Sequence, residues 1–356
     1  MGPAYYARNT AWILLTFATA ALGANVSDEA DLAIRQLNHG DFASAQKTAQ
    51  QTLAAVQENR QEDTLGGAAA LAAMGTVLQA EARFSEAQAM LEHALAIRER
   101  LLAPDDPLIA YTLNNLAVVY RQEGRLSDAA SLYQRAVGIY QHATSKDLVA
   151  VLNNLGRVLA DQGEHKEAER RFRQAISAAE KNFGPDHPET SVGLSNLGNL
   201  LVTRRKFNAA EAMLARAETI DRRNFADGHL RIGYDLNNDG NLAFARKQWA
   251  RAEQLLEQSL AILEKRLPAN HPDTGKVVGN LADVYRMQGR LEESEAAYRK
   301  ALRMLEQAWG PESLQLLPTL LAYSQVLRAR QEYAEAEALE VRSTRIRVAL
   351  ALRGAE

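Results

Sequence analysis

Apolar residues recur at helical spacing along most of the chain, and the pattern repeats as a unit. Leu113, Leu116 and Ala117 share one side of a predicted helix, Gly124 ends it, and a second amphipathic helix follows over 126–141. Glycine suits the left-handed residue that closes a helix. Each unit therefore predicts two helices joined by a tight turn.

The unit is easiest to follow from a small residue near the start of its second helix. Eight copies of this residue are separated by 42, 42, 39, 42, 42, 42 and 42 residues, with no long gap. We therefore predict one continuous array over 25–356 and no separate second domain. The predicted repeats fall near 27–65, 66–106, 107–145, 146–187, 188–229, 230–271, 272–311 and 312–352.

Three further features recur in register with these repeats. Arg205 and Lys247 stand where other copies place the turn glycine. Prolines concentrate between repeats, whereas Pro318 falls early in a predicted helix and is expected to shift its start or kink it. One column of the first helix is uniformly small, which predicts a close approach of two helices: Ala33, Gly75, Ala117, Gly156, Gly198, Gly240, Ala282 and Ser324.

The first 24 residues have the layout of an export signal. Arg8 precedes an uncharged apolar run over 11–24 that is short for a membrane span and ends in small residues. Cleavage is expected after Ala20 or Ala24, and the alternative is a hydrophobic helix or anchor that is kept. With no cysteine in the chain, a periplasmic or extracellular location in a bacterium is favoured.

The composition of the chain argues against several classes of function. The 356 residues are 47% hydrophobic and 24% charged with a net charge of -3, which predicts a folded protein with no overall attraction to nucleic acid. The absence of cysteine removes thiolate chemistry, and the seven histidines form no metal-ligand pattern. We predict no enzyme, cofactor, metal, nucleic acid or small-molecule substrate, and membrane contact only through an uncleaved N-terminal segment.

The columns of small, large and aromatic residues resemble the tetratricopeptide repeat. The period and the segments "LNNLA", "QEGRLSDAASLYQRAV" and "FGPDHPETS" are similar to the kinesin light chain type of that repeat. The resemblance covers roughly 27–352 and implies an all-α, right-handed solenoid of about eight helix-turn-helix repeats. It also implies that the first helices line a concave groove. The linker "HATSKD" lacks the proline motif, so the turn after the third repeat is expected to differ.

Two columns of asparagine run along the first helices and are expected to line this groove. The first, Asn115, is continued without interruption in the next four repeats, and the second, beginning at Asn114, varies more. A carboxamide both donates and accepts, so a row of amides can hold an extended backbone. Equally, each asparagine could bridge to the neighbouring first helix and fix the stacking of repeats. We favour stacking for the Asn115 column and ligand contact for the Asn114 column.

Charged and aromatic residues accompany the amides on the same face. The inward columns hold more basic than acidic residues, so the groove is predicted to be basic although the chain is acidic. The predicted groove residues are Tyr111, Asn114, Asn115, Arg121, Asn153, Asn154, Arg157, Asn196, Asn199, Tyr234, Asn237, Asn238, Asn241, Phe244, Lys276, Asn280, Arg286 and Arg328. They favour an extended protein segment with acidic and aromatic side chains as the partner.

One residue interrupts the core pattern. Asp239 occupies a column that holds Leu197 and Leu281 in neighbouring repeats, and a lone buried carboxylate is costly. We expect the sixth repeat to be looser there, or Asp239 to pair with Arg231 or a lysine.

These observations predict an exported scaffold that captures a partner segment in its groove. Two alternatives stay open. The chain could be a structural subunit of an envelope or secretion assembly that uses its convex face or its ends. It could also be a non-catalytic accessory module of a separately encoded enzyme system.

Overall fold

The computed structural model of the chain describes residues 23–353 apart from 39, 82 and 143–146. The predicted export signal lies almost wholly outside the described residues, as does most of the "HATSKD" linker. Every regular element in the described part is helical, which confirms the predicted all-α class. None of the described helices is both long and apolar enough to cross a membrane.

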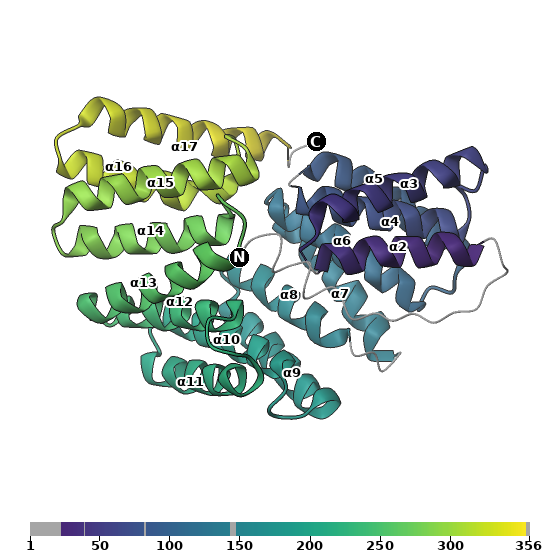
Figure 1. Ribbon diagram of the computed structural model, residues 1–356, viewed down its shortest axis with the longest axis horizontal. Helices are drawn as coiled ribbons and strands as arrows, with labels where there is room; N and C mark the ends of the chain where they lie inside the picture. The colour runs from purple at the N-terminus through teal and green to yellow at the C-terminus, as the bar shows by residue number, and fades with distance from the viewer. Residues whose placement is uncertain (1–22, 39, 82, 143–146, 354–356) are drawn as a thin grey trace. The chain divides into compact units, whose positions relative to one another are not determined.

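The chain divides into two compact units, of which the N-terminal one ends at Glu164. Its helices pack against their neighbours in chain order (Figure 1). Leu113, Leu116 and Ala117 are buried as the periodicity predicts, and Tyr133 and Tyr140 are among the largest fully buried side chains. The helices are α2 (Gly23–Asn38), α3 (Phe42–Glu58), α4 (Leu65–Ala80), α5 (Phe84–Leu101), α6 (Pro107–Gln122), α7 (Leu126–His142) and α8 (Leu148–Asp161).

The C-terminal unit begins at His165 and is built in the same way. One of its apolar clusters gathers Leu256 and Leu263 from one helix with Val277, Leu281 and Val284 from the next. Figure 1 shows its last helices as successive layers at the green-to-yellow end of the chain. The helices are α9 (His165–Phe183), α10 (Pro188–Thr203), α11 (Phe207–Asn224), α12 (Leu230–Ala245), α13 (Trp249–Arg266), α14 (Pro272–Met287), α15 (Leu291–Trp309), a 3-10 helix η1 (Leu314–Leu316), α16 (Leu317–Ala329) and α17 (Tyr333–Arg353).

Where the structure describes it, the turn inside the hairpins holds a left-handed residue. Gly124 and Gly289 both have a φ of 79°. Arg205 and Lys247, which replace glycine in this column, adopt φ values of 57° and 62°. The turn geometry is therefore kept where glycine is absent, at the conformational cost that a side chain adds there.

The linkers between repeats are fixed by caps and by the following second helix. His187 and His271 are N-caps, and the Nδ1 atom of each accepts a backbone N–H at 3.1 and 3.2 Å. The predicted shift of the helix start at Pro318 is observed. The 3-10 helix η1 precedes α16, and Pro318 lies in the first turn of α16.

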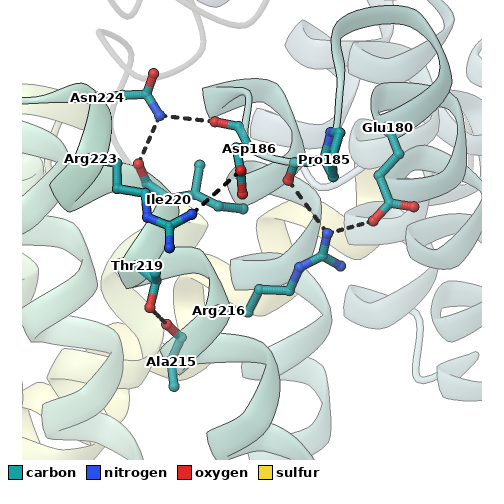
Figure 2. Close-up of polar contacts among 9 residues, drawn as sticks. All are labelled: Glu180, Pro185, Asp186, Ala215, Arg216, Thr219, Ile220, Arg223 and Asn224. Carbon is teal, nitrogen blue, oxygen red and sulfur yellow. Dashed lines mark hydrogen bonds and ion pairs between the residues drawn. The ribbon is translucent and has the colours of Figure 1, made fainter.

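The second helix of one repeat also binds the linker of the repeat before it. In Figure 2, Arg216 on α11 pairs with Glu180 at 2.6 Å and donates to the carbonyl of Pro185. Asn224 donates to the carbonyl of Asp186 at 2.9 Å. Similar ion pairs join later second helices, namely Lys300–Glu264 at 3.0 Å and Arg342–Glu306 at 2.5 Å.

Candidate partner-binding face

The predicted groove residues all lie on first helices of the hairpins. Their asparagines form what we call the amide face: Asn114 and Asn115 on α6, Asn153 and Asn154 on α8, Asn196 and Asn199 on α10, Asn237, Asn238 and Asn241 on α12, and Asn280 on α14. Arg328 lies further along, on α16.

In the N-terminal unit the amides bond from one helix to the next. Asn154 Nδ2 donates to Asn114 Oδ1 at 3.1 Å, and Asn115 Nδ2 donates to the Thr76 hydroxyl at 3.3 Å. Asn114 also donates to Asn115 Oδ1 at 3.2 Å. All four side chains are buried, and so is Asn153. The two columns therefore form one network, which includes Thr76, a residue that the asparagine pattern did not reveal.

The same type of bond recurs in the C-terminal unit. Asn280 Nδ2 donates to Asn237 Oδ1 at 2.9 Å, and Asn199 Nδ2 donates to Asn238 Oδ1 at 3.1 Å. Asn238 is buried, whereas Asn199, Asn237 and Asn280 are half-buried. Bonds between consecutive first helices are those that the stacking interpretation expects. Ligand contact by the Asn114 column stays a prediction, and in this structure Asn114 is 4% exposed.

The remaining predicted residues differ in how far they reach the surface. Asn196 is buried, and Arg328 is exposed. In each unit the half-buried residues are those that a partner could contact. They are Tyr111, Arg121 and Arg157 in the N-terminal unit, and Asn199, Tyr234, Asn237, Asn241, Phe244, Lys276, Asn280 and Arg286 in the C-terminal unit.

Several of the predicted basic groups are paired with carboxylates of the chain itself. Arg121 contacts Asp161 at 2.6 Å, and Arg286 contacts Asp283 at 3.0 Å. Arg328 binds Glu340 on α17 through two nitrogen–oxygen contacts of 2.7 Å. The positive charge predicted for this face is therefore partly neutralised before any partner arrives.

Lys276 lies in a second polar group, at the N-terminal end of α14. Its Nζ is 3.6 Å from Asp273 Oδ1 and 5.0 Å from the centre of the Trp309 ring. Tyr234 donates its hydroxyl to Asp273 Oδ2 at 3.0 Å. Burial lowers the pKa of Lys276 to about 7.

Asp221 and Asp235 are acidic groups that the sequence interpretation did not single out. They are 2% and 5% exposed. Asp221 Oδ1 accepts a hydrogen bond from the Ser191 hydroxyl at 2.6 Å, and Arg231 Nη1 is 4.0 Å from Asp221 Oδ2. The sequence does contain a sign that these positions are buried. One repeat later, 42 residues on, the equivalent positions hold the apolar residues Leu263 and Val277.

Asp239, the predicted irregularity, lies nearby on α12. It is half-buried, and burial raises its pKa to about 6. Among the residues that the structure describes, histidines, aspartates and glutamates form no group of three or more that could hold a metal ion.

The fold and this face define a class of protein, an all-helical scaffold of repeated hairpins. The sequence model of the tetratricopeptide repeat matches residues 67–142, 147–223, 236–307 and 279–347. The chain therefore belongs to the tetratricopeptide repeat family, which confirms the family predicted from the repeat pattern.

Three known proteins are similar to this chain over different fractions of its length. Human mitochondrial tetratricopeptide repeat protein 19 is 29% identical over 113 residues, so the match spans about 30% of this chain and 30% of the relative. BtubC (BKLC) from P. vanneervenii is 23% identical, with 62% of this chain and 90% of that chain covered and a TM-score of 0.50. A Rap protein complexed with Competence and Sporulation Factor is 14% identical, with coverages of 92% and 99% and a TM-score of 0.62.

Proposed function

We propose that this protein is a protein-interaction scaffold that binds an extended segment of a partner along the amide face. The observation that carries the proposal is the strip of half-buried amides over α10, α12 and α14, formed by Asn199, Asn237, Asn241 and Asn280. Carboxamides that bond to each other can exchange these bonds for the N–H and C=O groups of an extended backbone.

Aromatic residues beside the amides support the same function. Tyr234 and Phe244 are half-buried on α12, and Phe244 lies 5.1 Å from Trp249, measured between ring centres. They give apolar contact to aromatic side chains of the partner, while Arg121 and Arg286 favour acidic ones. The solved Rap protein of similar fold holds a bound factor, Competence and Sporulation Factor, which supports capture as a role for this fold.

Site-specific photo-crosslinking tests this proposal. A photoreactive amino acid at Asn241 should capture a partner in the native source, because this half-buried side chain lies on the amide face. The same substitution at Ala215, exposed on α11, serves as the control. Capture from Ala215 and none from Asn241 would place the working surface elsewhere.

A structural role through the end of the chain is the second candidate function. Val341 and Val348 on α17 are 61% and 53% exposed, so this last helix presents apolar side chains to solvent. A crosslinker at Val341 distinguishes the two functions. Reaction from this position alone would favour a subunit that assembles through α17.

We also propose that the protein is exported to the periplasm or beyond. Cleavage after Ala20 leaves α2 whole, whereas cleavage after Ala24 removes its first two residues. Mass spectrometry of the protein from its native source should find an N-terminus at residue 21 or 25. An intact Met1 in a cytoplasmic fraction would contradict export.

A further inference from the structure

Two buried aspartates lie at the junction between α11 and α12, where one repeat of the C-terminal unit is followed by the next. Asp221 lies near the end of α11, and Asp235 lies on α12, which follows it. Asp221 is satisfied in part by the Ser191 hydroxyl and by Arg231. Within the described part of the chain, Asp235 Oδ2 is buried without a hydrogen-bond partner. A buried carboxylate oxygen in this position is costly while it is charged.

Comparison with the next repeat shows that this junction is unusual. Leu263 and Val277 stand 42 residues after Asp221 and Asp235. Both belong to one hydrophobic cluster and are 0% and 2% exposed. An apolar contact between a second helix and the following first helix is thus replaced by two carboxyl groups.

Charged groups lie on several of the helices around this junction. Carboxyl groups come from Glu189 on α10, Glu218 and Asp221 on α11, and Asp239 on α12, while the basic groups are Arg222, Arg231 and Arg251. Acids therefore outnumber bases, and the buried acids cannot all ionise together without repulsion. Burial, followed by the Asp221 charge, raises the pKa of Asp235 to about 8. The pKa values of Glu189 and Asp221 are also raised by burial.

We propose that the α11–α12 junction is a proton-controlled joint, closed while Asp235 is protonated and opened locally when Asp235 ionises. In the closed state a neutral Asp235 can remain beside the Asp221 carboxylate. Loss of the proton leaves two like charges in a buried site, so the helices separate to hydrate them. The inference concerns the junction itself and does not depend on partner binding along the amide face.

The direction of the pH effect follows from linkage. The closed state binds the Asp235 proton more tightly than the open state does, because the open carboxyl has an ordinary pKa near 3.8. Closure is therefore fully favoured below about pH 4 and is lost as the pH rises toward 8. The open-to-closed ratio should rise by up to about tenfold per pH unit in this window and level off above it.

Hydrogen exchange resolved along the chain tests the joint. The full-length protein is compared with Asp235→Asn at each pH between 5 and 9, which cancels the intrinsic pH dependence of exchange. Amides of α11 and α12 in the native protein should lose protection relative to Asp235→Asn as the pH rises. Amides of α14 and α15 should show no such difference. Equal pH profiles in α11 and α12 of both proteins would overturn the proposal.

Three further variants control for folding and for the neighbouring acids. Asp235→Val installs the residue found at 277 and should give the same pH profile as Asp235→Asn. Asp221→Asn should flatten the profile in part, because it removes the like charge. Asp239→Asn should leave the rise between pH 6 and 8, and loss of that rise would assign the joint to Asp239 and overturn the role of Asp235.

Discussion

At the scale of single residues, Asp239 places a carboxyl group at a position where neighbouring repeats have leucine, which should lower the stability of the fold. Its pKa is raised to about 6, so it is neutral in the folded protein at pH 5 and charged at pH 7. Asp239→Leu should stabilise the protein at pH 7 by about 1–2 kcal/mol, since it restores an apolar contact. The gain should grow between pH 4 and 6, because a raised pKa means stability lost as the pH rises through it.

Thermal unfolding at several pH values measures this gain. Glu257→Leu, which changes an exposed glutamate on the neighbouring α13, is the matched control. An equal effect from both substitutions would show that hydrophobicity alone, and not the position of Asp239, accounts for it.

The bond between Asn154 and Asn114 allows a direct measurement of the amide network. Both side chains are buried, so either alanine variant removes this bond from a buried amide and should cost about 1–3 kcal/mol. In a double-mutant cycle with urea unfolding, the two changes should couple by about 0.5 kcal/mol or more. The pair Asn114 and Asn280, which belong to different units of the chain, should instead be additive. Additivity in both pairs would exclude the bond as a source of stability.

At the scale of elements, two glycines in helices should respond to the same substitution in opposite directions. A Cβ at Gly198 would lie 2.6 Å from Leu214 Cδ2, whereas a Cβ at Gly138 meets nothing within 4 Å. Gly138→Ala should therefore stabilise by about 0.5–1 kcal/mol through helix propensity. Gly198→Ala should destabilise by about 1–2 kcal/mol, because overpacking exceeds that gain. Urea midpoints measure both changes, and a stabilising Gly198→Ala would show that α10 and α11 can separate freely.

The helices also show which features of the fold and of the candidate site the sequence alone could predict. Periodicity and turn residues predicted the hairpins because each depends on local spacing, as at Gly124 and Lys247. Pairing of side chains depends on distances between helices, which the sequence does not contain. The sequence pattern therefore predicted Arg328 as a groove residue for a partner, whereas in the structure Glu340 on α17 binds its guanidinium. The burial of Asp235 depends on how α11 packs against α12, and the only trace of it in the sequence is the apolar Val277 at the same position of the next repeat.

At the scale of the whole molecule, acidic and basic side chains are nearly balanced in number, and three of the predicted cations are held in ion pairs. The chain carries 41 basic and 44 acidic side chains, and Arg121, Arg286 and Arg328 each have an acidic partner within it. An acidic partner segment must compete with these carboxylates. Capture should consequently depend only weakly on salt, since each new contact replaces an existing one.

Removing the competing carboxylates tests this balance directly. The triple variant Asp161→Asn, Asp283→Asn and Glu340→Gln keeps the size of each side chain and removes one carboxylate partner from each of Arg121, Arg286 and Arg328. If the partner segment is acidic, capture should strengthen by about tenfold or more, because charge-assisted hydrogen bonds contribute about 1.5–3 kcal/mol each. Its salt dependence should also become steeper.

A matched triple variant on exposed second-helix positions, Glu257→Gln, Glu292→Gln and Glu335→Gln, changes the net charge equally. Capture should be unaffected by this control, because none of the three carboxylates neutralises a cation predicted to contact the partner. Equal strengthening by both variants would mean that overall charge attracts the partner. No change in either would mean that the partner is recognised through its backbone and aromatic side chains, with the amides of α10, α12 and α14 as the determinants.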